Sequence, residues 1–287
     1  MKIRLFLLAT LLGMSSLCRG DDPNSVLVFP GANSRETYFT LHHIKEAQAI
    51  SKGKGCKVGI LDHSFGVSLH PNLYAGGQNF VKGGEEFLTK REWHGYWMAT
   101  VLHEIAPEAE IYALSARTFK SRILDAEAMA KAIDWAIEHH LDVLTYSAEA
   151  FEGAPKQMLE AALERAHKAG IVTTFIHTGF AQNILPDGLF NPDKEDGREA
   201  DIHVLHYDYT VVPIKQWEGT ERFFSISSTA PVLGGVVAMM KSLRPDLSPD
   251  KCKQILRETA FPLTFHNQKP PRVLDALAAV KFVQALH

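Results

Sequence analysis

The sequence predicts an α/β protein with a mostly parallel central sheet and helices on both faces. Strand-like and helix-like segments alternate from about residue 56 to residue 176, and short turns separate them. Such alternation is typical of βαβ units, whose crossover helices cover both faces of a parallel sheet. The sequence has no internal repeat, no low-complexity segment and no clear linker, so one domain is expected.

The expected elements follow from hydrophobic periodicity and from the breakers between apolar segments. Four apolar runs are interpreted as buried strands: residues 56–62, 109–115, 141–146 and 171–176. Seven segments are interpreted as helices: residues 41–51, 94–105, 125–139, 155–168, the stretch after Ser227, 249–258 and 274–286. Glycine pairs at 76–77 and 83–84 bracket a flexible region that we expect to be hairpin-like.

The first 20 residues have the layout of a secretory signal peptide. Lys2 and Arg4 precede an apolar run over residues 5–13, which is too short to span a bilayer, and small and polar residues follow up to Gly20. We therefore expect an exported protein, secreted or periplasmic, with residues 21–43 as an N-terminal lead-in. Cys18 offers an alternative, a lipid anchor, although residues 15–17 match a lipidation signal poorly. No other long apolar run exists, so no transmembrane segment is expected in the mature chain.

Net charge and cysteine usage argue against nucleic-acid binding, disulfide bonds and cysteine-based metal sites. The net charge is −3, which argues against nucleic acid or an anionic membrane as the main partner. Cys56 and Cys252 lie in apolar patterns and are expected to be buried thiols rather than a disulfide or metal ligands. The acidic segment 191–201 suits either a structural calcium ion or a solvated loop, and the solvated loop is preferred. No cofactor is expected.

A long apolar helix is expected within residues 223–243, FFSISSTAPVLGGVVAMMKSL, behind a group of hydroxyl residues that suit a helix cap: Ser225, Ser227 and Ser228. A helix that is apolar on nearly all sides belongs in the centre of a domain. Gly234 and Gly235 suggest that another backbone passes very close. Ser227 would then lie at the positive end of a buried helix, which suits a nucleophile, although a serine there is by itself more often a simple helix cap.

Three chemically reactive side chains are placed at one rim of the predicted sheet. Asp62 ends a strand, whereas His94 and Ser227 each begin a helix. Functional residues of parallel sheets gather at the carboxyl ends of strands and the amino ends of the following helices. A serine hydroxyl needs a base to become nucleophilic, and a buried carboxylate orients an imidazole base. Taken singly, Asp62 also suits a turn and His94 a surface helix start.

Several segments resemble a known family. KVGILDHSF, HGYWMATVLHEIAPEAEIYAL and SISSTAPVLGGVVAMM resemble, in this order, the Asp, His and Ser blocks of the subtilisin-like serine proteases. AIDWAIEHHLDVLTYS and AGIVTTFIHTG are similar to the segments that lead to that family's substrate-binding and oxyanion residues. The resemblance covers most of residues 44–260. It implies a subtilisin-like three-layer sandwich with residues 44–287 as the catalytic domain. It also implies Asp62 as orienting carboxylate, His94 as general base and Ser227 as nucleophile.

The sequence departs from the family around these residues. Where the family has a substrate-binding Ser-x-Gly, this chain has Ser147, Ala148 and Glu149. The family's oxyanion asparagine aligns with Gly179, and other donors could replace it: His177, Thr178 or Asn183. The family's Ser/Thr-Gly pair after the aspartate is replaced by His63 and Ser64. Losing one oxyanion donor costs on the order of 10²–10³ in kcat, as for a subtilisin asparagine, so reduced activity is expected. Residues 180–222 are expected to hold shortened strands and loops.

Three functions are compatible with these residues. The triad favours an exported serine endopeptidase that hydrolyses peptide or protein substrates through an acyl-enzyme. The altered substrate-binding and oxyanion segments favour a binding or scaffolding module of the same fold. An esterase-type hydrolase is disfavoured because no Gly-x-Ser-x-Gly surrounds Ser227. Cleavage specificity and oligomeric state are not predicted.

Some aromatic residues and histidines have expected positions as well. Trp97 is expected in the core, and His63 is expected to pack beside Asp62. The histidine pairs 42–43 and 139–140 are expected at the surface.

Overall fold

The computed structural model describes residues 35–66, 71–81, 87–88, 93–117, 122–147, 151–176, 181–184, 200–205, 208–210, 222–224, 226–262 and 272–286. Its centre is a five-stranded parallel sheet in the order β2-β3-β1-β4-β5. The strands are β1 (Lys57–Asp62), β2 (Gly76–Asn79), β3 (Glu110–Ser115), β4 (Val143–Tyr146) and β5 (Val172–Phe175). All but β2 lie within predicted strands, and the predicted α/β class is confirmed.

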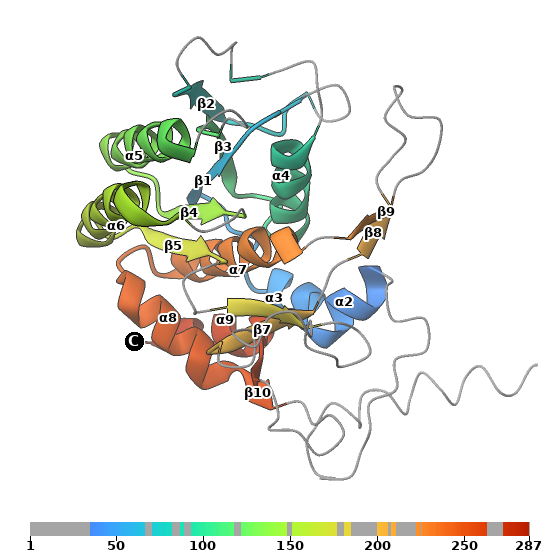
Figure 1. The fold of residues 1–287 in the computed structure, drawn as a ribbon. Coiled ribbons are helices and arrows are strands. Elements are labelled where there is room, and N and C mark those ends of the chain that lie inside the picture. Colours follow the sequence, from blue (N-terminus) through green and yellow to red (C-terminus); the bar gives the residue numbers. More distant parts are fainter. Residues whose placement is uncertain are drawn as a thin grey trace, which may run out of the picture.

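Helices cover both faces of this sheet and complete a three-layer sandwich (Figure 1). One face carries α5 (Arg122–Glu138) and α6 (Gly153–Lys168), and the other carries α4 (His94–Ile105) and α7 (Thr229–Leu243). The side chains of β1 alternate between the two cores. Val58 and Ile60 pack in the core with α4 and α7, whereas Leu61 packs in the core with α5 and α6. Because β1 is the middle strand, Asp62 lies at the centre of the sheet's carboxyl edge.

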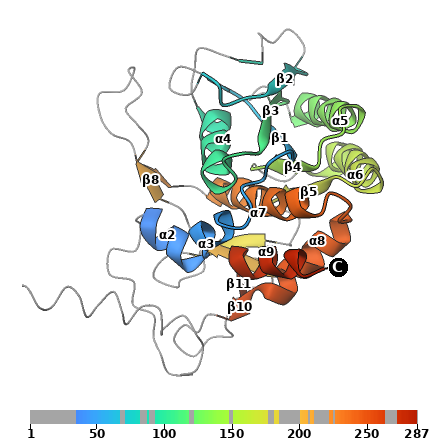
Figure 2. The same ribbon diagram turned by 180° about the vertical axis from the view of Figure 1, so that it is seen from behind.

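A second, smaller sheet lies beyond α7 (Figure 2), with the strand order β10-β11-β7-β6. Its strands are β6 (Ala181–Ile184), β7 (Ile202–Leu205), β10 (Phe261–Pro262) and β11 (Arg272–Val273). The helices of this part are α2 (Arg35–Leu41), α3 (Ile44–Gln48), α8 (Pro249–Thr259) and α9 (Ala276–Gln284). A separate antiparallel pair is formed by β8 (Asp208–Thr210) and β9 (Arg222–Phe224). None of these strands was predicted individually.

His42 is fully buried, so its predicted surface position is wrong. Its Nδ1 donates to the carbonyl oxygen of Leu274 at 2.8 Å, and its Nε2 accepts the backbone N–H of Leu205 at 3.0 Å. Burial lowers the pKa of His42 to about 4, against the opposing effect of the Leu274 hydrogen bond. A neutral imidazole thus joins the end of α2 to β7 and to the segment after β11. The pair at 139–140 is exposed, as predicted.

The glycine-rich segment after residue 75 is an edge strand where a hairpin was expected. β2 pairs in parallel with β3, with Gly76 opposite Tyr112 and Asn79 opposite Ser115. A Cβ at position 77 would collide with the carbonyl oxygen of Ala113, so Gly77 lets the two strands approach. Residues 82–86, which include the second glycine pair, lie outside the described ranges.

The glycines of α7 allow close packing, as predicted, but against side chains rather than a neighbouring backbone. A Cβ on Gly234 would lie 2.5 Å from Cγ2 of Thr145 in β4. A Cβ on Gly235 would lie 2.6 Å from Cγ2 of Ile105 at the end of α4. These two contacts set the depth at which α7 lies between the main sheet and α4.

The cysteine and tryptophan predictions are confirmed. Cys56 and Cys252 are buried free thiols, and burial raises the pKa of both, that of Cys252 to about 11. Trp97 is buried in the core with α4 and α7.

The amino-terminal predictions lie partly outside the structure. The signal peptide over residues 1–20, its cleavage position and the Cys18 anchor stay predictions, because residues 1–34 are not described. Within the predicted lead-in, Tyr38, Phe39 and Leu41 of α2 are buried in the same core as α4 and α7. No helix in the described part of the chain has the length and apolar character needed to span a bilayer.

Candidate active site

The carboxyl edge of the main sheet brings the end of one strand and the starts of two helices together. β1 ends at Asp62, and α4 begins at His94. Ser227 lies in a short 3₁₀ turn, η2 (Ile226–Ser228), that continues into α7. In a parallel sheet the carboxyl ends of all strands meet at one edge, and the following helices start there. This topology brings together three residues separated by up to 165 positions.

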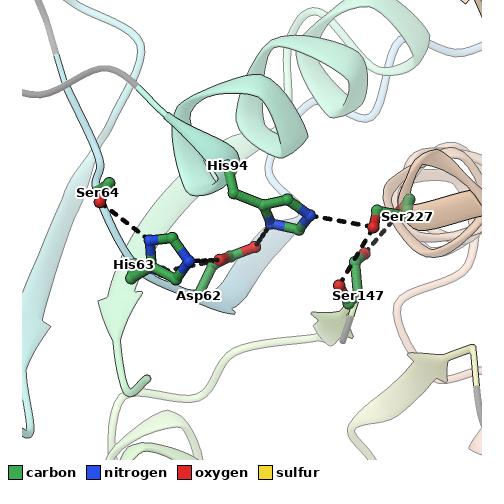
Figure 3. A network of polar contacts seen from close by, with 6 residues as sticks. All are labelled: Asp62, His63, Ser64, His94, Ser147 and Ser227. Carbon is green, nitrogen blue, oxygen red and sulfur yellow. Dashed lines mark hydrogen bonds and ion pairs between the residues drawn. The ribbon is translucent and has the colours of Figure 1, made fainter. Parts of the chain in front are cut away.

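The side chains of Asp62, His94 and Ser227 form a continuous hydrogen-bonded line (Figure 3). Nδ1 of His94 lies 2.6 Å from Oδ2 of Asp62, and Nε2 of His94 lies 3.0 Å from Oγ of Ser227. In the tautomer that satisfies both contacts, Nδ1–H donates to the carboxylate and Nε2 accepts the serine hydroxyl proton. The structure therefore brings together the three residues predicted to form the triad.

Burial differs along this line. Asp62 is 2% exposed, and its second oxygen, Oδ1, accepts the backbone N–H of His63 at 2.8 Å. Ser227 is 8% exposed, and the His94 side chain is 15% exposed. A buried carboxylate keeps its charge only when hydrogen bonds replace water, and both Asp62 oxygens have such partners. The geometry thus suits a serine whose proton passes to an imidazole that a buried anion orients.

The backbone of Ser227 and of the first turn of α7 is hydrogen-bonded to side chains at the ends of β4 and β5. Oγ of Ser147, the residue after β4, donates to the carbonyl oxygen of Ser227 at 2.7 Å. One turn later, Oγ1 of Thr174 in β5 donates to the carbonyl oxygen of Ala230 at 2.9 Å. These bonds fix the amino end of α7 against the sheet. Ser228 is the helix-cap residue, but its side chain makes no capping hydrogen bond, so the predicted hydroxyl cap is not formed by that residue.

The two residues after Asp62 connect β1 to the start of α4. The carbonyl oxygen of His63 accepts the N–H of Gly95 at 2.9 Å, and that of Ser64 accepts the N–H of Trp93 at 3.1 Å. Ser64 has φ +58°, a left-handed conformation that costs a residue with a side chain about 1–2 kcal/mol. His63 packs beside Asp62, as predicted. Sequence reasoning gave Ser64 no role, and its only signal was a serine where the resemblance implied a glycine.

The other predicted site residues are placed less completely. Ala148, Glu149, Thr178 and Gly179 lie outside the described residues, as does His177. Asn183 lies in β6, where its backbone pairs in register with Val204, and its side chain is not described. Of the predicted substrate-binding residues, Ser147 alone is described, and it contacts Ser227.

No metal site is evident in the part of the chain that the structure describes. Within it, no group of three or more His, Cys, Asp or Glu side chains is arranged to hold a metal ion. Most of the acidic segment 191–201 lies outside the described ranges. Asp201, at its end, forms an exposed ion pair with Arg257 at 2.7 Å.

No protein-family model matches the chain. In sequence, it is 25% identical over 279 residues to a thermostable alkaline protease of Halalkalibacterium halodurans, a match that spans 83% of this chain and 73% of that protein. The similarity therefore covers most of both proteins rather than one motif.

Solved structures share the fold at lower identity. MycP1 with its N-terminal propeptide removed superimposes with a TM-score of 0.70 at 16% identity, over 85% of this chain and 96% of MycP1. Another MycP1 structure is described as that of a serine protease of the type VII (ESX-1) secretion system, with a TM-score of 0.69 at 16% identity over 89% and 91% of the chains. The prenylagaramide maturation protease PagA gives 0.62 at 18% identity, over 84% and 98%.

These comparisons agree with the sequence blocks and with the fold. The match with the alkaline protease links the sequence to a protease, and the MycP1 and PagA structures share the three-layer architecture. The order Asp62, His94, Ser227 along the chain is the order of the family blocks. The chain therefore resembles the subtilisin-like serine proteases in its sequence blocks, is similar in sequence to an alkaline protease, and shares its fold with serine proteases of known structure.

Proposed function

We propose that this chain is an exported serine endopeptidase that hydrolyses peptide bonds through an acyl-enzyme on Ser227. The observation that carries the proposal is the line of hydrogen bonds from Oδ2 of Asp62 through both nitrogens of His94 to Oγ of Ser227. A binding module of this fold would not need all three side chains in this hydrogen-bonded arrangement.

The steps follow from the positions of these groups. Oγ of Ser227 attacks the carbonyl carbon of the scissile peptide bond while Nε2 of His94 takes its proton. Asp62 stabilises the imidazolium that forms. The same proton then passes from Nε2 to the leaving amine, and the C–N bond breaks to give an ester on Ser227. Water attacks this ester with His94 again as base, which releases the carboxylic acid and restores the serine hydroxyl.

The tetrahedral intermediate carries a negative charge on the former carbonyl oxygen, and hydrogen-bond donors must stabilise it. The backbone N–H of Ser227 and the amino end of α7 are candidates, since backbone amides and the helix dipole both favour an anion there. Gly179 stands where the family resemblance places the oxyanion asparagine, so we propose a kcat below that of family members with this residue.

Labelling with a fluorophosphonate probe tests the proposal directly. The native protein should form one adduct, located on Ser227 by peptide mass spectrometry, and Ser227→Ala or heat-denatured protein should form none. A nitrophenyl ester should give a burst of product close to one equivalent of enzyme, because acylation precedes hydrolysis. Equal absence of labelling in native and denatured protein would favour the binding module instead.

Substrate class and localisation are tested separately. A peptide library with internal and terminal cleavable bonds distinguishes endopeptidase from exopeptidase activity, with Ser227→Ala as the control. We propose export because residues 1–20 have the signal layout, and a fold neighbour belongs to the periplasmic assembly of the ESX-5 inner membrane complex. Amino-terminal sequencing of exported protein would give a start near Asp21, whereas a retained Met1 in a cytoplasmic fraction would contradict export.

A further inference from the structure

The carboxylate of Asp62 faces two imidazoles. His94 lies on one side, with Nδ1 at 2.6 Å from Oδ2, and His63 lies on the other, with Nε2 at 3.8 Å from Oδ1 (Figure 3). The two rings are nearly parallel, with an interplanar angle of 28° and centroids 6.0 Å apart. The distance from His63 is longer than a hydrogen bond, so the contact is electrostatic and steric.

His63 is itself held in place. It is 7% exposed, and its Nδ1 lies 2.9 Å from Oγ of Ser64. When the Ser64 hydroxyl donates to Nδ1, the proton of the neutral ring is on Nε2, which faces Asp62. Ser64 reaches this position in the left-handed conformation, which a glycine would adopt without strain. In this conformation the carbonyl oxygen of Ser64 also accepts the Trp93 N–H, so the backbone holds the turn and places the hydroxyl against His63.

The segment that carries His63 is also fixed to the start of α4. Its carbonyl oxygen accepts the Gly95 N–H at 2.9 Å, and a Cβ on Gly95 would lie 2.5 Å from this oxygen. The chain that bears His63 is therefore packed tightly against the first turn of the helix that bears His94. Movement of one imidazole relative to the other is restricted by the backbone as well as by the side chains.

We propose that His63 is a positioning residue, which keeps the Asp62 carboxylate turned so that Oδ2 accepts the Nδ1–H of His94. The proposal rests on the function proposed above. The His63 ring occupies the space into which the carboxylate would rotate, and its Nε2–H edge attracts Oδ1. The backbone N–H of His63 also holds Oδ1 and is unaffected by side-chain substitution, so the effect of removing the ring is partial.

Three variants test this role in the full-length protein. His63→Ala should lower kcat about tenfold with an unchanged KM, because the base is less well oriented while substrate contacts persist. His63→Gln should stay within about threefold of wild type, since its amide nitrogen reaches to where Nε2 lies. Ser64→Gly should fold well and lower kcat about threefold, because only the hydroxyl partner of His63 is lost. His167→Ala, on the exposed end of α6 at the opposite edge of the sheet, is the control.

A spectroscopic readout separates this proposal from the proposed function. The downfield proton resonance of His94 Nδ1–H reports its bond to Asp62 without any turnover. We expect this resonance to shift or broaden in His63→Ala and to recover in His63→Gln. Unchanged kcat and an unchanged resonance in His63→Ala would overturn the positioning role, even if Ser227 is labelled normally.

Failure of wild type to label would contradict the proposed function, and the resonance would still decide whether His63 orients Asp62. If His63→Ala does not fold, His63→Asn replaces it. Its shorter amide reaches Ser64 but not Oδ1, so it should show the same lowered kcat and altered resonance. Wild-type values for His63→Asn would overturn the proposal.

Discussion

Two histidines in this protein have the same hydrogen-bonding arrangement in two different regions. His94 at the sheet edge and His42 at the end of α2 each donate from Nδ1 and accept at Nε2, and each joins three chain segments. The partners of His94 are a carboxylate and a hydroxyl. The partners of His42 are a backbone carbonyl and a backbone amide, which never change charge.

The difference between these regions shows what separates a structural histidine from a catalytic one. His42 is completely buried, and its pKa is lowered to about 4, because desolvation of the charged ring outweighs the stabilising effects of the Leu274 carbonyl and the Asp275 carboxylate. His94 is partly exposed, and Asp62 can stabilise its charged form. Both imidazole rings make the same pair of hydrogen bonds. Only His94 has a hydroxyl partner that can give it a proton and a carboxylate partner that can stabilise the resulting charge.

The largest effect is expected at the carboxylate. Asp62→Asn should lower kcat by about 10⁴-fold, because an amide at this position favours the wrong tautomer of His94. The free energy of unfolding should change little, since the two side chains have a similar volume. Peptide hydrolysis and thermal unfolding would measure both, with the exposed Asp134→Asn as a control. A decrease in kcat of less than tenfold would show that Asp62 does not orient the catalytic base.

The opposite pattern is expected at His42. His42→Ala should lower the free energy of unfolding by about 3 kcal/mol, because it leaves a cavity and strands the Leu205 N–H and the Leu274 carbonyl. The kcat of the folded fraction should stay within about twofold of wild type. Urea unfolding and active-site titration separate stability from activity. A large loss of kcat per titrated site would show that the two regions are coupled.

The pH dependence of stability sharpens the comparison further. The pKa of His42 is about 4 in the folded protein, against 6.5 as the ordinary value. The unfolded chain therefore binds more protons between these values, and stability is lost as the pH falls from about 6.5 towards 4. This group should contribute a loss of about 2 kcal/mol between pH 7 and pH 5. Urea unfolding of wild type at both pH values should show a loss larger by that amount than in His42→Gln.

The smallest effect is expected for Ser147→Ala. The hydroxyl donates to the carbonyl oxygen of Ser227, and a hydrogen bond of this kind stabilises by about 1 kcal/mol. The melting temperature should fall by roughly 2–4 °C in a chain of this size. The value of kcat should fall less than tenfold, because the Asp62–His94–Ser227 line stays intact. A loss comparable to that of Asp62→Asn would make Ser147 a member of the catalytic group.

The sequence predicted the main sheet because its strands are continuous apolar runs bounded by turns. The run KVGILD in β1 is apolar at successive positions because its side chains pack alternately in the two cores. The helices α4 to α6 were predicted from apolar residues at helical spacing. β2, with the residues GGQN, has no strand propensity of its own, and it is a strand because β3 pairs with it. β10 and β11 have two residues each and carry no periodicity at all.

The candidate site was predictable in part for the same reason. Asp62, His94 and Ser227 follow from the ends of well-marked elements, so their convergence could be inferred from topology. The burial of His42 could not, because its partners lie 163 and 232 positions away in the small sheet and before α9. The conformation of Ser64 was harder to predict, since a serine does not itself indicate a positive φ and the only signal was the glycine that the family resemblance implied at this position.

The position of β1 in the middle of the main sheet protects the site against local unfolding. Strands at both edges can open locally while β1 stays paired with β3 and β4. Asp62 is thus attached to the part of the molecule that opens last. Amide hydrogens of Val58 to Leu61 are expected to exchange only through global unfolding, so the anchor of the carboxylate should persist through the fluctuations that admit a peptide chain.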